Sequence, residues 1–118
     1  MKILKVDNIN KSFGKLHVLK NLSFTLETGE ILGFIGPNGS GKSTTMKCIA
    51  NLVFPESGTV EIAGHDLSKE RSQALSHLSA LIEAPGLYFN LTGMENLKVF
   101  ASLRQISRKR LEEVIEFT

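Results

Sequence analysis

Apolar and polar residues alternate along residues 21–27, where Leu22, Phe24 and Leu26 are separated by polar side chains. A period of two is typical of a half-exposed strand, because successive side chains point to opposite faces of a sheet. Residues 2–30 as a whole are predicted to form β-structure. The run from Ile31 to Ile35 contains no polar side chain and predicts a buried strand. Shorter strands are expected over residues 59–62 and 81–82.

Helical spacing of apolar residues appears after residue 43 and again after residue 92. A helix is predicted to follow Ser43, and a second one to cover about residues 69–77. Thr92 and Glu95 have the spacing of a capping box, which predicts a third helix from there through Leu103. Ser107 fits the cap of a fourth. The chain is therefore predicted to be an α/β protein.

A glycine-rich segment separates the predicted strand at residues 31–35 from the first helix. It reads Gly36, Pro37, Asn38, Gly39, Ser40, Gly41, Lys42 and Ser43, and it matches the phosphate-binding loop pattern of glycine, four residues, glycine, lysine and serine. Glycines let the backbone approach a ligand closely, and the N–H groups at the start of the helix attract anions. We expect Lys42 to lie between the β- and γ-phosphates, the Ser43 hydroxyl to ligate Mg²⁺, and Thr44 to donate to the α-phosphate.

Composition restricts the remaining possibilities. The 118 residues, 42% of them apolar, suit one modest domain, and 14 basic against 12 acidic residues give no indication of nucleic-acid binding. The only cysteine, Cys48, excludes an internal disulfide, is expected to pack as a small apolar residue, and favours the cytoplasm. The sequence has neither a signal peptide nor an apolar run of about 20 residues, so a membrane role is expected only through a partner. His17, His65 and His77 lack the spacing of a metal site and are interpreted as surface residues.

The chain resembles, over essentially its whole length, the nucleotide-binding subunit of an ABC transporter. The similarity depends on four segments in the family's order: Lys11 to Gly14, Gly36 to Thr44, Gly58 to Leu67, and Leu91 to Leu97. It implies a P-loop NTPase fold of the ABC ATPase type, with an antiparallel β-subdomain over residues 1–30, part of the nucleotide-binding core over 31–83, and the start of a helical subdomain over 84–118. It also implies ATP and Mg²⁺ as ligands, and a transmembrane permease and a second ATP-binding subunit as partners. The implied location is the inner face of the cell membrane.

The resemblance assigns roles to two further residues. Phe13 is implied as the ring that stacks on adenine, although a phenylalanine in a β-rich region is otherwise usually part of the core. Glu83 stands where most of the family has glutamine. A carboxylate still ligates Mg²⁺ but has no amide to donate, so Glu83 is expected to be a metal ligand together with Ser43. Together with Ala84 to Tyr88, Glu83 makes the chain similar to the subgroup that exports bacitracin- or lantibiotic-type peptides. Without the resemblance, Glu83 is interpreted as an ordinary exposed glutamate.

Three parts that the family uses for hydrolysis are missing from the 118 residues. They contain no apolar strand followed by an aspartate and a catalytic glutamate, no serine-glycine-glycine signature and no later histidine switch. The chain is therefore expected to be the N-terminal portion of an ATPase that binds nucleotide without turning it over. Its uncovered apolar segments are expected to make it associate or rearrange.

Two alternative functions remain open at this point. One is a short protein that binds nucleotide or a membrane subunit and has no catalytic activity. The other, weaker because the guanine-reading segment of GTPases is missing, is another P-loop GTPase or a small-molecule kinase.

Overall fold

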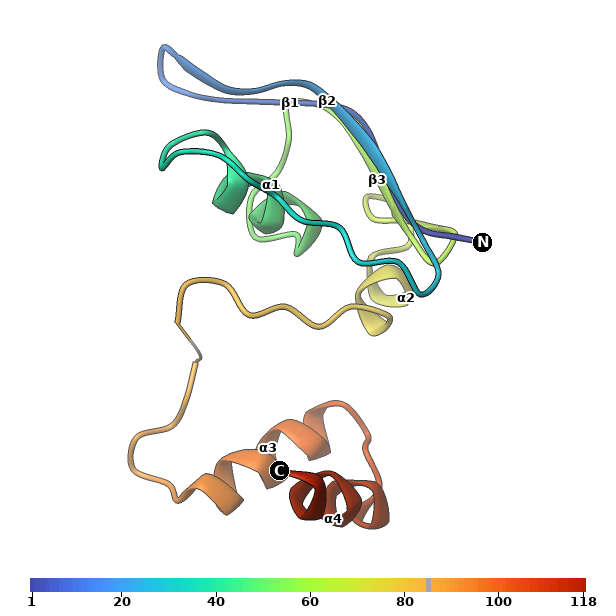
Figure 1. Cartoon of the computed structure of the whole chain (residues 1–118), viewed down its shortest axis with the longest axis vertical. Coiled ribbons are helices and arrows are strands. Elements are labelled where there is room, and N and C mark those ends of the chain that lie inside the picture. Colours follow the sequence, from blue (N-terminus) through green and yellow to red (C-terminus); the bar gives the residue numbers. More distant parts are fainter. Residues whose placement is uncertain (85) are drawn as a thin grey trace. The chain divides into compact units, whose positions relative to one another are not determined.

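The computed structural model describes residues 1–84 and 86–118, and it divides into two compact units, residues 1–82 and 83–118. The first unit contains four strands and two helices: β1 (Lys2–Phe13), β2 (Leu16–Glu27), β3 (Ser57–Ile62), β4 (His65–Asp66), α1 (Lys42–Ile49) and α2 (Arg71–Ser76). The second unit contains α3 (Gly93–Leu103) and α4 (Arg108–Phe117). Figure 1 labels most of these elements along the chain.

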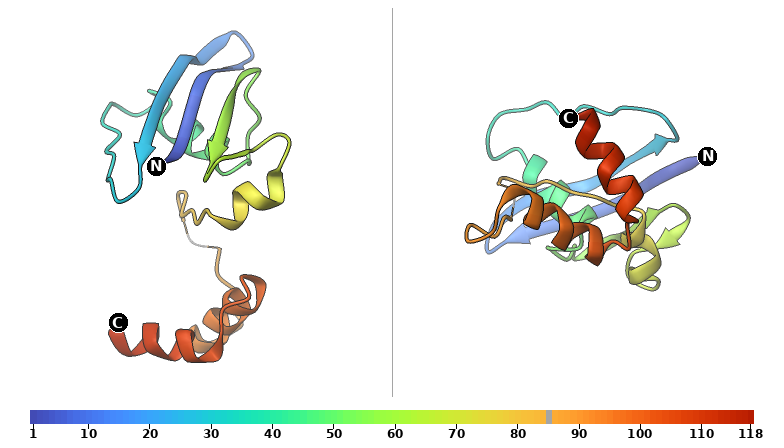
Figure 2. Two further views of the ribbon diagram at one scale, coloured as in Figure 1. Left: turned by 90° about the vertical axis from the view of Figure 1, so that its right-hand side faces the viewer. Right: turned by 90° about the horizontal axis from the view of Figure 1, so that it is seen from below.

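The strands form one antiparallel sheet in the order β2-β1-β3-β4. β1 and β2 make a long hairpin that turns at residues 14 and 15, and β3 runs along the other side of β1, as the left view of Figure 2 shows. A two-residue turn at Ala63 and Gly64, both with positive φ, joins β3 to β4. The β-structure predicted for residues 2–30 and 59–62 is confirmed.

Asparagines interrupt the alternation along both long strands. Asn8 on β1 and Asn21 on β2 have φ of 49° and 47°, and the pairing register shifts beside each of them. As a result, Val6 and Ile9 are both buried although they are three residues apart, where strict alternation would put them on opposite faces. The Asn10 side chain holds the two irregular stretches together: its amide donates to Asn8 O at 3.0 Å and to Asn21 Oδ1 at 3.1 Å, and its oxygen accepts from Asn21 N.

The core of the first unit lies between the inner face of this sheet and its helices. Cys48 and Ile49 of α1 and Ala74 of α2 are buried, and together with strand and loop residues they form a single apolar cluster. Its other fully buried members are Val6, Ile9, Leu19, Val60, Ile62 and Leu67. Cys48, 1% exposed, packs as the small apolar residue that was expected, and burial raises the pKa of its thiol.

Gly58 determines how closely β3 approaches β1. Its φ is 91°, and a Cβ at this position would lie 2.4 Å from the carbonyl oxygen of Asn8 and 2.5 Å from that of Asp7. No side chain fits this space, and the left-handed backbone adds strain for any residue with a Cβ. Gly58 is thus required where β3 meets the irregular stretch of β1.

The prediction of a buried strand at Ile31 to Ile35 is wrong. These residues form no strand, Ile31 is 96% exposed and Ile35 is fully exposed. Phe34 alone packs firmly, edge to face against Phe24 with ring centroids 5.1 Å apart. The physical reason is that no strand among the described residues lies beside the segment, and without one its N–H and C=O groups have no ladder partners. Leu81 and Ile82, also predicted as a strand, form none either.

The second unit confirms both predicted helix caps. Thr92 accepts from the N–H of Glu95 at 3.1 Å and donates its hydroxyl to the Glu95 carboxylate; Ser107 accepts from Arg110 N at 3.2 Å. Asn96, 7% exposed, is the unit's buried polar residue: it accepts from Tyr88 N at 2.8 Å and donates to the carbonyls of Tyr88 and Thr92. These bonds tie the segment before α3 to the helix itself.

Candidate phosphate-binding site

The glycine-rich loop turns back on itself before α1 begins. Ser40 N donates to Pro37 O at 3.2 Å, and Gly39 and Gly41 take φ of 84° and 97°. Gly41 is the residue at which the loop meets the sheet. A Cβ there would lie 2.9 Å from Cδ2 of Leu19 and 3.3 Å from the carbonyl oxygen of Val18. Only glycine therefore lets the helix start this close to β2.

The N-terminus of α1 leaves its first donors available. Gly41 occupies the cap position, so within the described structure no side chain caps the helix, and the first turn contains no acidic residue. The first hydrogen bond within the helix runs from Thr45 N to Gly41 O at 2.9 Å. The N–H groups of Lys42, Ser43 and Thr44 precede it and have no acceptor within the helix. Such a set of donors at the positive end of a helix dipole suits a phosphate group.

Lys42 adds a full positive charge to this loop. Its ammonium donates to the carbonyl oxygen of Gly36 and, at 3.1 Å, to that of Pro37. The amine thus lies within the turn that the loop encloses. Because the lysine side chain is flexible, an anionic oxygen of a ligand can replace the two carbonyl oxygens that the ammonium contacts. The donor set and this cation fit a polyphosphate. The exposed Ser43 hydroxyl fits a hard cation such as Mg²⁺, which prefers oxygen ligands.

Sequence reasoning missed a supporting residue, Thr45. It is 2% exposed, and its hydroxyl donates to Gly41 O at 2.7 Å. The same carbonyl accepts from Thr45 N, so this one residue fixes the cap glycine through two hydrogen bonds. The available signal was a hydroxyl residue four positions after the cap, a spacing that allows a bond back to the preceding turn.

The loop borders a hollow of about 380 Å³ that reaches the end of the β1–β2 hairpin. Its lining consists of Leu16, Val18, Asn38, Gly39, Gly41, Lys42, Ser43 and Thr44. Phe13 pairs directly with Leu16 across the hairpin, so the two side chains share a face of the sheet, and Phe13 is half exposed. The structure brings the end of β1 near the predicted loop residues. Phe13 is not a buried core residue.

Glu83 belongs to the second unit, whereas Ser43 belongs to the first. Glu83 is exposed and has a φ of 66°, an uncommon backbone conformation for a residue other than glycine. Such strain often marks a functional position. The pairing of Glu83 with Ser43 around a metal ion stays a prediction. The neighbouring Pro85 lies outside the described residues.

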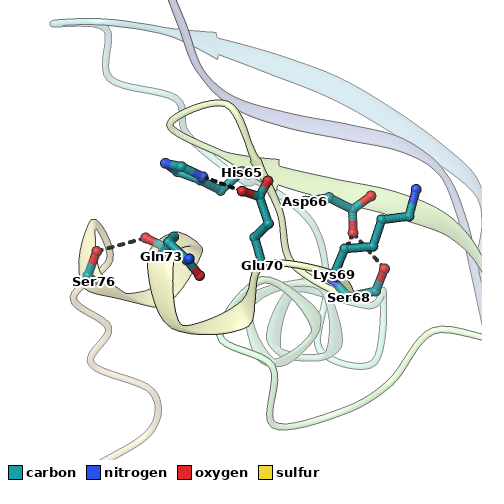
Figure 3. Close-up of polar contacts among 7 residues, drawn as sticks. All are labelled: His65, Asp66, Ser68, Lys69, Glu70, Gln73 and Ser76. Atoms are coloured by element: carbon teal, nitrogen blue, oxygen red, sulfur yellow. Dashed lines mark hydrogen bonds and ion pairs between the residues drawn. The ribbon is translucent and has the colours of Figure 1, made fainter.

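The three histidines differ in their surroundings. His17 and His77 are exposed, and the side chain of His65 is 32% exposed, so all three reach the surface as expected. His65 Nδ1 lies 3.2 Å from the Glu70 carboxylate, a contact drawn in Figure 3, and its ring stacks on His77 with centroids 5.9 Å apart. Among the described residues no cluster of histidine, cysteine or acidic side chains could hold a metal.

Comparisons with known proteins agree with this geometry. The family profile described as "ABC transporter" matches residues 19–117. The bacitracin transport ATP-binding protein BcrA of Bacillus licheniformis is 36% identical over 97% of this chain and 38% of its own length. The lantibiotic transport ATP-binding protein SrtF of Streptococcus pyogenes is 36% identical over 92% of this chain and 46% of its own length. A solved structure of an ATP-binding subunit of an ABC transporter superposes with a TM-score of 0.85 at 32% identity, over 94% of this chain and 46% of that one.

The chain belongs to the ABC transporter family. It spans less than half the length of these relatives, and the aligned part is similar to an ABC ATP-binding subunit in both sequence and fold. The resemblance drawn from the motifs, including the bacitracin and lantibiotic relatives, is therefore confirmed. In the part of the chain that the structure describes, no helix is both long and apolar enough to cross a bilayer.

Proposed function

We propose that this chain is the nucleotide-holding portion of an ABC ATPase subunit and binds Mg²⁺-ATP through the loop at residues 36–44. The observation that carries the proposal is the start of α1. A glycine cap without a side-chain acceptor leaves three N–H donors available, and the Lys42 ammonium lies within the same loop. Both features suit an anion.

The residues at the start of α1 and the ring of Phe13 have distinct parts in this proposal. The N–H groups of Lys42, Ser43 and Thr44 bind phosphate oxygens, and the Lys42 ammonium moves from the loop carbonyls to the β- and γ-phosphates. The adenine base stacks on the exposed ring of Phe13. Because Phe13 lies across from Leu16, which lines the hollow beside the loop, a nucleotide can reach both places.

Magnesium, when bound, would neutralise negative charge on the phosphates. The Ser43 hydroxyl is the proposed ligand from α1, and the Glu83 carboxylate is the proposed ligand from the second unit. A carboxylate attracts the ion more strongly than the amide of glutamine does. Glu83→Gln is therefore expected to raise the magnesium concentration needed for nucleotide binding, and unchanged magnesium dependence would count against the ligand role.

Binding without turnover is proposed for the 118 residues alone, because they contain no catalytic glutamate after an apolar strand. In the longer proteins of this family, hydrolysis of ATP would then require residues outside this chain, a second ATP-binding subunit and a permease. Export of a peptide antibiotic is proposed because two of the relatives are bacitracin and lantibiotic transport proteins. Attachment to the inner face of the membrane would come through the permease.

Titration calorimetry with Mg²⁺-ATP tests this proposal. We expect Lys42→Ala to weaken binding by roughly ten- to a hundredfold, the value of a lost charge-assisted hydrogen bond. Lys47→Ala is the matched control, because it removes the same charge from the same helix outside the loop. Equal affinity of wild type and Lys42→Ala would contradict the assignment. Tighter binding of GTP than of ATP would favour the GTPase alternative, and ATP turnover that Lys42→Ala abolishes would contradict binding without hydrolysis.

A further inference from the structure

Lys11 is a charged residue to which the phosphate loop assigns no role. Its ammonium nitrogen lies 5.2 Å from the centroid of the Phe13 ring, over the ring face, within the range of a cation–π contact. Within the described structure Lys11 has no ion pair with a carboxylate. The ring of Phe13 is therefore the contact that the structure gives for this charge.

The backbone places Lys11 at the same end of the hairpin as the loop. Lys11 pairs with Leu19 on β2, and Leu19 is the side chain that a Cβ on Gly41 would meet. Burial raises the pKa of the Cys48 thiol, and the charge of Lys11 opposes that rise, so this charge acts on α1 as well. Lys11 thus lies between the start of the nucleotide loop and the aromatic ring at the hairpin tip.

We infer that Lys11 is a positioning residue for nucleotide binding, whose ammonium covers one face of the Phe13 ring and leaves the opposite face for the purine base. The inference rests on the proposed function and adds to it a second residue that acts on the base. Phe13 is 50% exposed, which is consistent with one covered and one open face. A cation on one face also withdraws electron density from the ring, which favours stacking of an electron-rich purine on the other.

Direct contact between Lys11 and a phosphate is the competing explanation, and it makes a different prediction. A residue that binds phosphate contributes equally to ATP and to inorganic tripolyphosphate, which has no base. A residue that acts through Phe13 contributes to ATP alone. The effect of Lys11→Met on ATP affinity should also vanish once the ring of Phe13 is removed, because both substitutions then remove the same contact.

The first test is the binding of Mg²⁺-ATP and Mg²⁺-tripolyphosphate to the full chain by titration calorimetry. Lys11→Met should weaken ATP by about two- to fivefold, leave tripolyphosphate unchanged, and have no further effect in a Phe13→Leu background. Lys11→Arg should restore the ATP affinity. Lys15→Met, which removes the same charge from the neighbouring turn, is the matched control and should change neither ligand.

The second test needs no nucleotide. The sequence has no tryptophan, so Phe13→Trp would introduce a single indole, which can be excited at a longer wavelength than Tyr88. Adding Lys11→Met to this variant should increase quenching of the indole by acrylamide, whereas adding Lys15→Met should not. Equal quenching with Lys11 and with Met at residue 11 would overturn the inference, as would equal weakening of ATP and tripolyphosphate by Lys11→Met. A wild-type chain that binds neither ligand would instead contradict the proposed function, while the fluorescence result would still decide the contact between Lys11 and the ring.

Discussion

Residues 2–27 and residues 31–35 differ in a way that apolar content does not explain. The β1–β2 hairpin alternates apolar with polar residues, yet it forms an ordered sheet with Ile9 fully buried. The segment from Ile31 to Ile35 is apolar throughout, yet it forms no strand and leaves both isoleucines in solvent. The hairpin supplies its own ladder partner, whereas none of the strands that the structure describes pairs with the segment. Hydrophobicity therefore marks residues that can be buried, while backbone pairing decides which of them form a strand.

The contact between β3 and β1 gives the largest expected effect. Gly58→Ala would place a Cβ 2.4 Å from a backbone carbonyl in a left-handed conformation, and we expect the sheet to lose about 4 kcal/mol of unfolding free energy. Gly64→Ala is the matched control, because Gly64 also has positive φ but no atom lies within 4 Å of the added Cβ. It should cost about 1–2 kcal/mol. Urea unfolding of the two variants separates the clash with the β1 carbonyl oxygens from the backbone strain that both variants share. Equal losses of unfolding free energy would refute the close approach of β3 to β1 at Gly58.

The two isoleucines at the extremes of exposure compare the regions directly. Ile9→Ala should cost about 3 kcal/mol of unfolding free energy, because it leaves a cavity in the core. Ile35→Ala, an identical change at a fully exposed residue, should alter that free energy by less than about 0.5 kcal/mol. Both values can be obtained from urea melts followed by circular dichroism. A comparable loss in the two variants would mean that residues 31–35 are buried after all.

The asparagine network explains how the hairpin remains ordered despite its irregular stretches, and it gives a smaller effect. Asn10→Ala removes the amide that bonds Asn8, Asn21 and Ser57, and we expect a loss of about 1–3 kcal/mol. Hydrogen exchange should show faster exchange of Asn21 N, whose acceptor is the Asn10 side chain. Unchanged protection at Asn21 would show that the network contributes little to the pairing.

The turn after β4 gives the smallest expected effect, a dependence on acid. Hydrogen bonds from the Ser68 hydroxyl and backbone hold the pKa of the Asp66 carboxyl below its ordinary value of 3.8, and Figure 3 shows this turn. A lowered folded-state pKa gives stability that is present above pH 3.8 and lost as the pH falls through the folded value. Asp66→Asn should therefore be slightly less stable at neutral pH and converge with wild type in acid. A difference in unfolding free energy between Asp66→Asn and wild type that persists at the lowest pH would show that it does not arise from ionisation of Asp66.

Local signals predicted much of this fold. Alternation identified the strand at residues 21–27, and the spacing of Thr92 and Glu95 identified a helix start that the structure confirms. The loop pattern located the glycine-rich turn at the start of α1. The shifts in pairing register at Asn8 and Asn21 could not be predicted, because a bulge depends on the facing strand. The failure at residues 31–35 has the same origin, since a buried strand is a property of its neighbours.

The site divides in a similar way. The loop at Gly36 to Ser43 could be located from the sequence, because its pattern is local, and the roles proposed for its residues stay predictions. Thr45 and Lys11 act through residues brought near by the fold, and periodicity alone did not single them out as partners of Gly41 and Phe13. A loop made of consecutive residues is thus easier to find in a sequence than a contact between residues that the fold brings together.

Amide chemical shifts of the loop test the central claim most directly. We expect Mg²⁺-ATP, added to the ¹⁵N-labelled chain, to shift the N–H signals of Gly39, Gly41, Lys42, Ser43 and Thr44 most strongly. Inorganic tripolyphosphate should shift the same loop signals without moving Phe13. Loop signals that stay in place at saturating nucleotide, or shifts confined to other parts of the chain, would contradict a phosphate site at the start of α1.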